Sequence, residues 1–159
     1  MSPFLRFMKQ ERQLIIALRR NARASLTSFV RKFDIPQSTL YALLAKLEKG
    51  AIRRHTCLLD FHALGFHTHA MLLIAAPKHL RRKIEAYLDG HPSVNSFWRT
   101  LGTPDYLCEV IFEDEGKLKA FVEEFHETNR RARCQVLHVL EEKGRERFLM
   151  EGTSGSKDC

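Results

Sequence analysis

The stretch NARASLTSFVRKFDIPQSTLYALLAKLEKGAI, residues 21–52, decides the fold. Ser25 is placed to cap a helix whose apolar residues recur at helical spacing up to Phe33. Pro36 pushes the residue before it away from helical geometry, so this helix should stop there. Leucines at i, i+3, i+4 and i+7 predict a second helix, and they are Leu40, Leu43, Leu44 and Leu47. Two such helices joined by a three-residue turn form a helix-turn-helix, which presents one helix outward.

The segments on either side extend this motif. Gly50 should end the second helix, and residues 51–55 should follow as a short basic strand, the wing. A helix from about residue 8 to residue 20 should supply the third wall of the core, with Leu14, Ile15 and Leu18 inward. The first domain is therefore predicted to be a winged helix-turn-helix over residues 1–56.

Composition restricts the class of protein. The chain has 159 residues, 44% of them hydrophobic, and no apolar run of membrane length. The apolar run at residues 14–18 is too short for the core of a signal peptide. The four cysteines lie far apart without a CxxC pair, which argues against a zinc site. We expect a reduced, cytoplasmic protein with no membrane contact.

Charge is concentrated in the first part of the chain. Residues 1–65 hold 12 Lys/Arg and 4 Asp/Glu, a net charge of +8, whereas residues 66–159 hold 14 and 15, a net charge of −1. A basic surface on the domain with the helix-turn-helix favours double-stranded DNA as the partner. The alternative is a basic face that only keeps the protein soluble.

The second part of the chain predicts an α+β domain. Its strands are predicted at residues 67–76, 94–101, 106–112 and 134–140, the last with a possible extension towards Phe148, and its helices at 78–89 and 116–128. The order βαββαβ is that of a ferredoxin-like sandwich. The predicted boundaries are a linker at 57–65, this domain at 66–150 and a disordered tail at 151–159.

The apolar residues of two predicted strands predict the oligomeric state. Residues 71–74 and 136–140 are apolar at nearly every position, so both faces of the sheet favour burial. Helices cover only one face of a ferredoxin-like sheet, and a second copy of the sheet is the simplest cover for the other. We therefore expect a homodimer, with further multiples of dimers.

Four short motifs occur in an order that resembles the Lrp/AsnC (feast/famine) family of prokaryotic transcriptional regulators. They are Asn21-Ala22-Arg23-x-Ser25, Ser38-Thr39-Leu40 followed by Leu47-Glu48-x-Gly50-x-Ile52, Leu59-Asp60-x4-Gly65, and Gly102-x2-Asp105-Tyr106-Leu107-x-Glu109-Val110. The resemblance implies a DNA-binding regulator modulated by an amino acid or similar small molecule. The family often carries arginines in the middle of the recognition helix, where this chain has Ala42 and Leu43.

The candidate DNA contacts lie in and around the second helix of the motif. Small residues opposite Leu40 would let this helix sink into the major groove, while neighbours reach phosphates and base edges. The predicted contacts are Ser25, Ser38, Thr39, Tyr41, Ala42, Lys46, Lys49, Arg53 and Arg54. Alternatively, Ala42 and Ala45 are only helix formers on a solvated face, and Arg53 and Arg54 only protect a strand edge.

The candidate effector site is the turn at residues 100–106, between neighbouring dimers. Backbone N–H groups of Gly102 and Thr103 suit a carboxylate, and Asp105 could accept from an ammonium group. The resemblance places effectors in this turn, and the predicted contacts are Thr100, Gly102, Thr103, Asp105 and Tyr106. The alternatives are that Asp105 only shapes the turn and that the turn serves assembly without a ligand.

Other functions have weaker support in the sequence. His67-x-His69 offers two ligands on one side of a strand, but nothing at matching spacing completes a metal site, and we expect neither metal nor cofactor. Siroheme decarboxylases resemble the same two-part architecture, but residues 94–99 lack the histidine of that enzyme, and we do not expect catalysis. A third alternative is a regulator that has lost DNA binding and pairs with relatives.

Overall fold

The computed structural model describes residues 9–23 and 25–149, which form two compact units. One unit holds the described residues up to Leu58 together with those from Gly144 on, and the other is Leu59–Lys143. The predicted linker, residues 57–65, falls across the boundary between the two units. The predicted tail, residues 151–159, lies outside the described residues.

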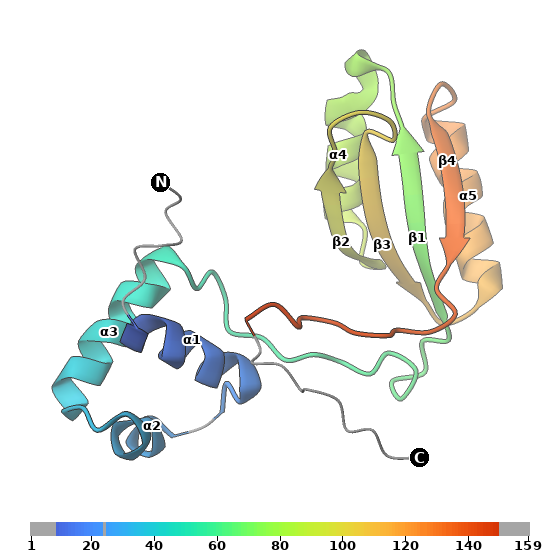
Figure 1. Ribbon diagram of the computed structural model, residues 1–159. Coiled ribbons are helices and arrows are strands. Elements are labelled where there is room, and N and C mark those ends of the chain that lie inside the picture. The colour runs from blue at the N-terminus through green and yellow to red at the C-terminus, as the bar shows by residue number, and fades with distance from the viewer. Residues whose placement is uncertain (1–8, 24, 150–159) are drawn as a thin grey trace. The chain divides into compact units, whose positions relative to one another are not determined.

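Three helices build the N-terminal unit: α1 (Lys9–Arg20), α2 (Leu26–Phe33) and α3 (Gln37–Gly50) (Figure 1). The Oγ of Ser25 accepts a hydrogen bond from the N–H of Ser28 at 3.3 Å, which confirms the predicted cap of α2. Residues 34–36 connect α2 to α3, as the proline predicted. The helices share one apolar core, made of Leu14, Ala17, Phe29, Ile35, Leu40 and Leu47.

The prediction of a wing strand is wrong. Residues 52–58 form no strand, and among the described residues none pairs with them. The N–H groups of Ala51 and Ile52 both donate to the carbonyl of Leu47 at 2.8 Å, so the chain is still completing the end of α3 where the prediction places the strand. Without a hydrogen-bonded neighbour, a basic segment of this length has no reason to adopt strand geometry.

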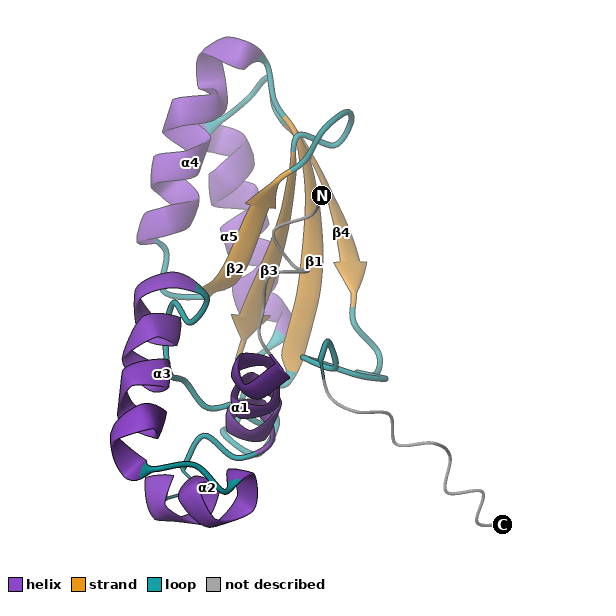
Figure 2. Cartoon of the chain, turned by 60° about the vertical axis from the view of Figure 1, so that its left-hand side comes forward, coloured by secondary structure: helices purple, strands orange, loops and turns teal. Residues whose placement is uncertain are grey.

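The second unit confirms the βαββαβ order. Its elements are β1 (Thr68–Ala75), η2 (Lys78–Leu80), α4 (Arg81–Gly90), β2 (Val94–Arg99), β3 (Tyr106–Phe112), α5 (Glu115–Thr128) and β4 (Arg133–His138). The four strands form an antiparallel sheet in the order β2-β3-β1-β4. Both long helices, α4 and α5, lie on the same face of this sheet (Figure 1, Figure 2).

Buried and partly exposed side chains alternate along β1, so the sheet has one face covered by helices and one open face. In β1, Ala70, Leu72 and Ile74 are fully buried, whereas Met71 and Leu73 between them remain partly exposed. The buried residues of β1 and β3 pack with α4 and α5 into the core of the unit. Among the described residues, no helix is both long enough and apolar enough to cross a membrane.

The last strand is shorter than predicted. β4 ends at His138, and Val139 adds one further hydrogen bond to the carbonyl of His69 at 2.8 Å. His138 already pairs with Ala70, close to the start of β1, so little of β1 remains as a partner for a longer strand. Leu140 is almost fully exposed, and residues 141–149 form no strand.

Candidate nucleic-acid interface and effector loop

The outward side of α3 carries the predicted DNA contacts. Leu40 and Leu47 face the core, and the remaining surface of the helix is left to small and polar side chains. Exposed side chains on α3 include Ser38, Thr39, Tyr41, Ala42, Ala45, Lys46 and Lys49. Ser25, Arg53 and Arg54 are exposed in the same unit. The structure therefore leaves every predicted DNA contact accessible to a partner.

Lys46 has a second role that its position in the sequence conceals. Its Nζ lies 2.5 Å from Oε1 of Glu11 in α1, and Glu11 is only 3% exposed. A buried carboxylate needs a cation or hydrogen-bond donors to offset its lost hydration. Lys46 thus holds α3 against α1, and its ammonium group gives one of its three donors to Glu11.

Ser25 is also partly committed. Its oxygen accepts the capping hydrogen bond at the start of α2, but a hydroxyl keeps a proton to donate. The start of a helix favours an anion, because its N–H groups carry partial positive charge. Ser25 therefore keeps a proton to donate while it caps the helix.

The turn between β2 and β3 is closed by its own hydrogen bonds. The N–H of Thr100 donates to the carbonyl of Asp105 at 2.8 Å, and the Thr100 hydroxyl donates to the carbonyl of Pro104. The N–H of Asp105 donates to the carbonyl of Ile74 at 2.8 Å, which ties the turn to the end of β1. Gly102 has φ of 103°, a region that other residues enter only with strain.

The carboxylate of Asp105 is occupied on both oxygens. Oδ2 accepts from the N–H of Ala76 at 2.7 Å, and Oδ1 accepts from the guanidinium of Arg81 at 2.5 Å. The Ala76 hydrogen bond, and then the charges of Arg81 and Arg99, hold the pKa of Asp105 below its usual range. An arriving ammonium group would have to compete with these partners.

A hollow of about 430 Å³ lies beside this turn. Its lining residues are Arg81, Arg99, Thr100, Leu101, Gly102 and Asp105, so it includes three of the five predicted effector contacts. Thr103 is exposed in the turn but does not line the hollow. Tyr106 lies elsewhere: its side chain is fully buried, its hydroxyl donates to Glu85 at 2.7 Å, and burial raises its pKa to about 12.

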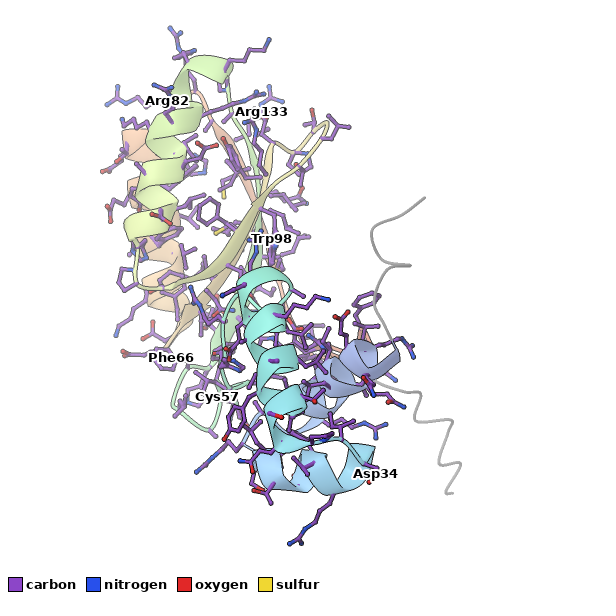
Figure 3. The ribbon with its side chains drawn as sticks, turned by 90° about the vertical axis from the view of Figure 1, so that its left-hand side faces the viewer. Asp34, Cys57, Phe66, Arg82, Trp98 and Arg133 are labelled. Atoms are coloured by element: carbon purple, nitrogen blue, oxygen red, sulfur yellow. The ribbon has the colours of Figure 1, made fainter. Side chains whose placement is uncertain are left out.

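The open face of the sheet is mostly apolar. It carries Met71, Leu73, Trp98, Leu107 and Leu137, and Figure 3 shows Trp98 on the side of the sheet away from α4. Trp98 is 49% exposed and Leu137 is 43% exposed. Large neighbouring apolar side chains at this exposure are typical of an interface.

A polar cluster interrupts this face. Oε1 of Glu109 lies 3.0 Å from Nε2 of His69, and Oε2 accepts from Nδ2 of Asn95 at 2.5 Å. His67 instead packs edge-on against the ring of His62, with 4.4 Å between centroids. In the described part of the chain, no three His, Cys, Asp or Glu side chains gather as metal ligands.

Comparison with known proteins identifies the family. Residues 69–147 match the family model for the Lrp/AsnC ligand binding domain. The HTH-type transcriptional regulator FL11 of Pyrococcus horikoshii is 22% identical over 114 residues, which cover 71% of this chain and 76% of the relative. A regulator of the same name from Pyrococcus abyssi is 23% identical over 114 residues, with the same coverage of 71% and 76%.

Solved structures show the same fold. A transcriptional regulator of Neisseria meningitidis in complex with L-Met has a TM-score of 0.80 and 22% identity, covering 87% of this chain and 93% of that chain. AsnC of E. coli has a TM-score of 0.78 and 18% identity, with coverage of 87% and 95%. The family model, the curated relatives and the fold agree, and the chain belongs to the Lrp/AsnC family.

Proposed function

We propose that this chain is a sequence-specific DNA-binding transcriptional regulator, and that its N-terminal unit works as a helix-turn-helix. The observation that carries the proposal is the exposed side of α3, where small and polar residues allow a close approach to a groove. The net charge of +8 over residues 1–65 supplies attraction to phosphates. Curated relatives named as HTH-type transcriptional regulators support the same function.

The contacts divide into two groups. Ser25, Ser38, Lys49, Arg53 and Arg54 are placed to meet phosphates and so to set the position of α3 on DNA. Thr39, Tyr41 and Ala42 are placed to meet base edges. Lys46 helps to hold α3 in position, because its ammonium group is bound to Glu11 of α1.

A charge placed on the groove-facing side of α3 tests the proposal. Ala42→Glu puts a carboxylate on the side of α3 that would enter the groove between the negatively charged strands, so we expect DNA binding to be lost while the protein stays folded. Gln10→Glu is the matched control, since it adds the same charge at an exposed position of α1. Equal affinity of both variants for DNA, or no DNA binding by the unaltered protein, would favour a regulator that acts only by pairing with relatives.

We also propose that the open face of the sheet pairs two copies of the chain. The open face has exposed apolar side chains on β2 and β4 and partly exposed ones on β1 and β3. These need a cover of matching chemistry, and a second copy supplies it by symmetry. A dimer would present two α3 helices, which suits a near-palindromic DNA site with half-sites about one helical turn, or a multiple, apart.

The effector is proposed to bind at the turn of residues 100–105. The hollow beside this turn has a volume that suits a small metabolite, since ligand pockets span roughly 300–1,000 Å³. The L-Met complex of the Neisseria meningitidis regulator supports small-molecule binding in a protein of this fold. Binding would be coupled to assembly, because the turn lies at the end of the sheet that forms the proposed dimer.

A further inference from the structure

The hollow beside the turn of residues 100–105 has an unbalanced charge. Two of its lining residues are arginines, Arg81 and Arg99, and one is an acid, Asp105. Asp105 already accepts from Arg81 and from the backbone of Ala76, so a ligand would have to share this carboxylate with both donors. A neutral amino acid would bring an ammonium group into a space where cations outnumber anions.

Arg81 keeps unused donors. Its guanidinium gives one hydrogen bond to Asp105, whereas its buried Nε has no hydrogen-bond partner among the described residues. An arginine side chain carries five N–H donors, and leaving a buried donor unpaired is unfavourable. The Asp105 carboxylate fixes the orientation of this group, so Arg81 is preorganised to receive a further acceptor.

Arg99 supplies the second cation from the other side of the turn. It is the last residue of β2, it pairs in register with Tyr106, and it is exposed. Its charge also reaches the carboxylate of Asp105, whose pKa it helps to lower. The hollow thus lies between one guanidinium that is bound to Asp105 and one that is exposed.

The surroundings of the hollow extend this positive charge. The start of α4, the α5–β4 turn and the end of β2 meet at one end of the unit, because Ala75 pairs with Arg133 and Ile74 with Tyr106. We call this region the basic end, and its cations outside the hollow include Lys78, Arg82, Arg130, Arg131 and Arg133. Figure 3 shows Arg82 and Arg133 at the same end of the unit.

Three consecutive acidic residues lie at the opposite end of the sheet. Glu113 and Asp114 lie between β3 and α5, and Glu115 is the first residue of α5. The N–H of His67, just before β1, donates to the carbonyl of Glu113 at 3.2 Å. Separation of the two charges along the sheet creates a field that draws small anions towards the basic end.

We propose that the hollow binds a small ligand with two or more negative charges, a dicarboxylate or a phosphate-bearing metabolite, held between Arg81 and Arg99. The inference rests on the proposed effector function of this turn and specifies its ligand class. Guanidinium groups bind carboxylate and phosphate oxygens through paired N–H donors, so either group fits the same two arginines. A zwitterion without a further negative charge gains much less from this site.

Calorimetric titration of the full chain tests this class. The probes are succinate for the dicarboxylate arm, inorganic phosphate for the phosphate arm and L-leucine for the neutral zwitterion. We expect at least one of the two anions to bind about tenfold or more tightly than leucine, a difference of about 1.4 kcal/mol. Leucine binding as tightly as both anions would overturn the proposal.

Matched arginine substitutions locate the ligand. Arg99→Gln removes the exposed cation of the hollow and should lower the affinity for the anion about tenfold or more, since hydrogen bonds between charged groups are among the strongest in proteins. Arg131→Gln removes the same charge elsewhere at the basic end and should change affinity much less. Equal loss in both variants would mean general attraction without a site and would overturn the proposal.

DNA affinity of the same samples separates this inference from the proposed function. If no probe binds at millimolar concentration while DNA binding persists, the ligand class is wrong and the regulator stands. If Arg99→Gln and Arg131→Gln weaken DNA binding and leave the probes unaffected, the basic end is a DNA surface, and the ligand proposal is again overturned.

Discussion

The Nζ of Lys46 in α3 lies 2.5 Å from the buried carboxylate of Glu11 in α1. This ion pair connects two residues that are 35 positions apart in the sequence. The pair places a cation of the proposed recognition helix in a structural role. Substitutions of Lys46 should therefore act first on the folded N-terminal unit and only through it on DNA.

Lys46→Met should lower the free energy of unfolding by about 1 kcal/mol. The estimate is modest because Lys46 is largely exposed and solvent screens the pair, although Glu11 itself is buried. Lys49→Met is the control, since Lys49 is exposed and no salt bridge to it is found in the described chain. Urea unfolding would show a lower midpoint for Lys46→Met alone; identical midpoints would mean that the ion pair does not stabilise the fold.

Arg53 and Arg54 should contribute to DNA affinity without choosing the sequence. If each meets a phosphate, replacing either by alanine should reduce the slope of log affinity against log salt by about one. Fluorescence anisotropy at several salt concentrations measures this slope on a preferred site and on an unrelated site. An unchanged slope would assign these arginines to a solvated surface.

Tyr41 should instead affect the choice of sequence. Its side chain is half exposed on the outward side of α3, where an aromatic ring can meet base edges. Tyr41→Ala should change the ranking of DNA sites in a binding selection while leaving the salt slope as it is. The same ranking before and after the substitution would place Tyr41 outside the interface.

Leu137 tests the pairing of the sheets. A lysine at this position would bring charge into an interface that we expect to bury on the order of 2,000 Å² or more in total. Leu137→Lys should therefore yield monomers, or aggregates if the exposed sheet associates at random. Ala120→Lys, on the exposed side of α5, is the control and should remain dimeric. Light scattering that finds the unaltered chain monomeric at micromolar concentration would contradict this interface.

Asp105 should make stability depend on pH in the acidic range. Its pKa is lowered in the folded protein, so its contribution is complete above the usual aspartate value of 3.8 and is lost as pH falls through the folded pKa. Asp105→Asn removes this contribution. Urea unfolding at a series of pH values should show the variant less stable near neutrality and the difference shrinking with acid. A constant difference would mean that Asp105 does not titrate with folding.

Local patterns predicted much of the fold. The leucines of α3 repeat at helical spacing, Ser25 caps α2 as its side chain suggests, and β3 has the predicted bounds of Tyr106 and Phe112. Each of these features depends on neighbours in sequence. The wing strand at residues 51–55 failed because strand formation depends on a partner, and the basic character of a segment does not supply one.

The candidate site was less predictable, because its interactions join distant residues. Asp105 and Arg81 are 24 residues apart, and Lys46 and Glu11 are 35 apart, so spacing gave no sign of either pair. Tyr106 follows Asp105 directly, yet strand alternation turns its side chain into the core. The net charge of residues 66–159 also gave no sign of the basic end. The sum is −1, and the cations come together only because the strands pair in this register.

Selection of genomic DNA fragments by the purified full chain tests the central claim most directly. A dimeric helix-turn-helix regulator should enrich a small set of sequences that share a near-palindrome, with half-sites about one helical turn, or a multiple, apart. Ala42→Glu should abolish the enrichment, and Gln10→Glu should preserve it. Fragments recovered without a shared motif, or in equal yield by both variants, would contradict sequence-specific DNA binding through α3.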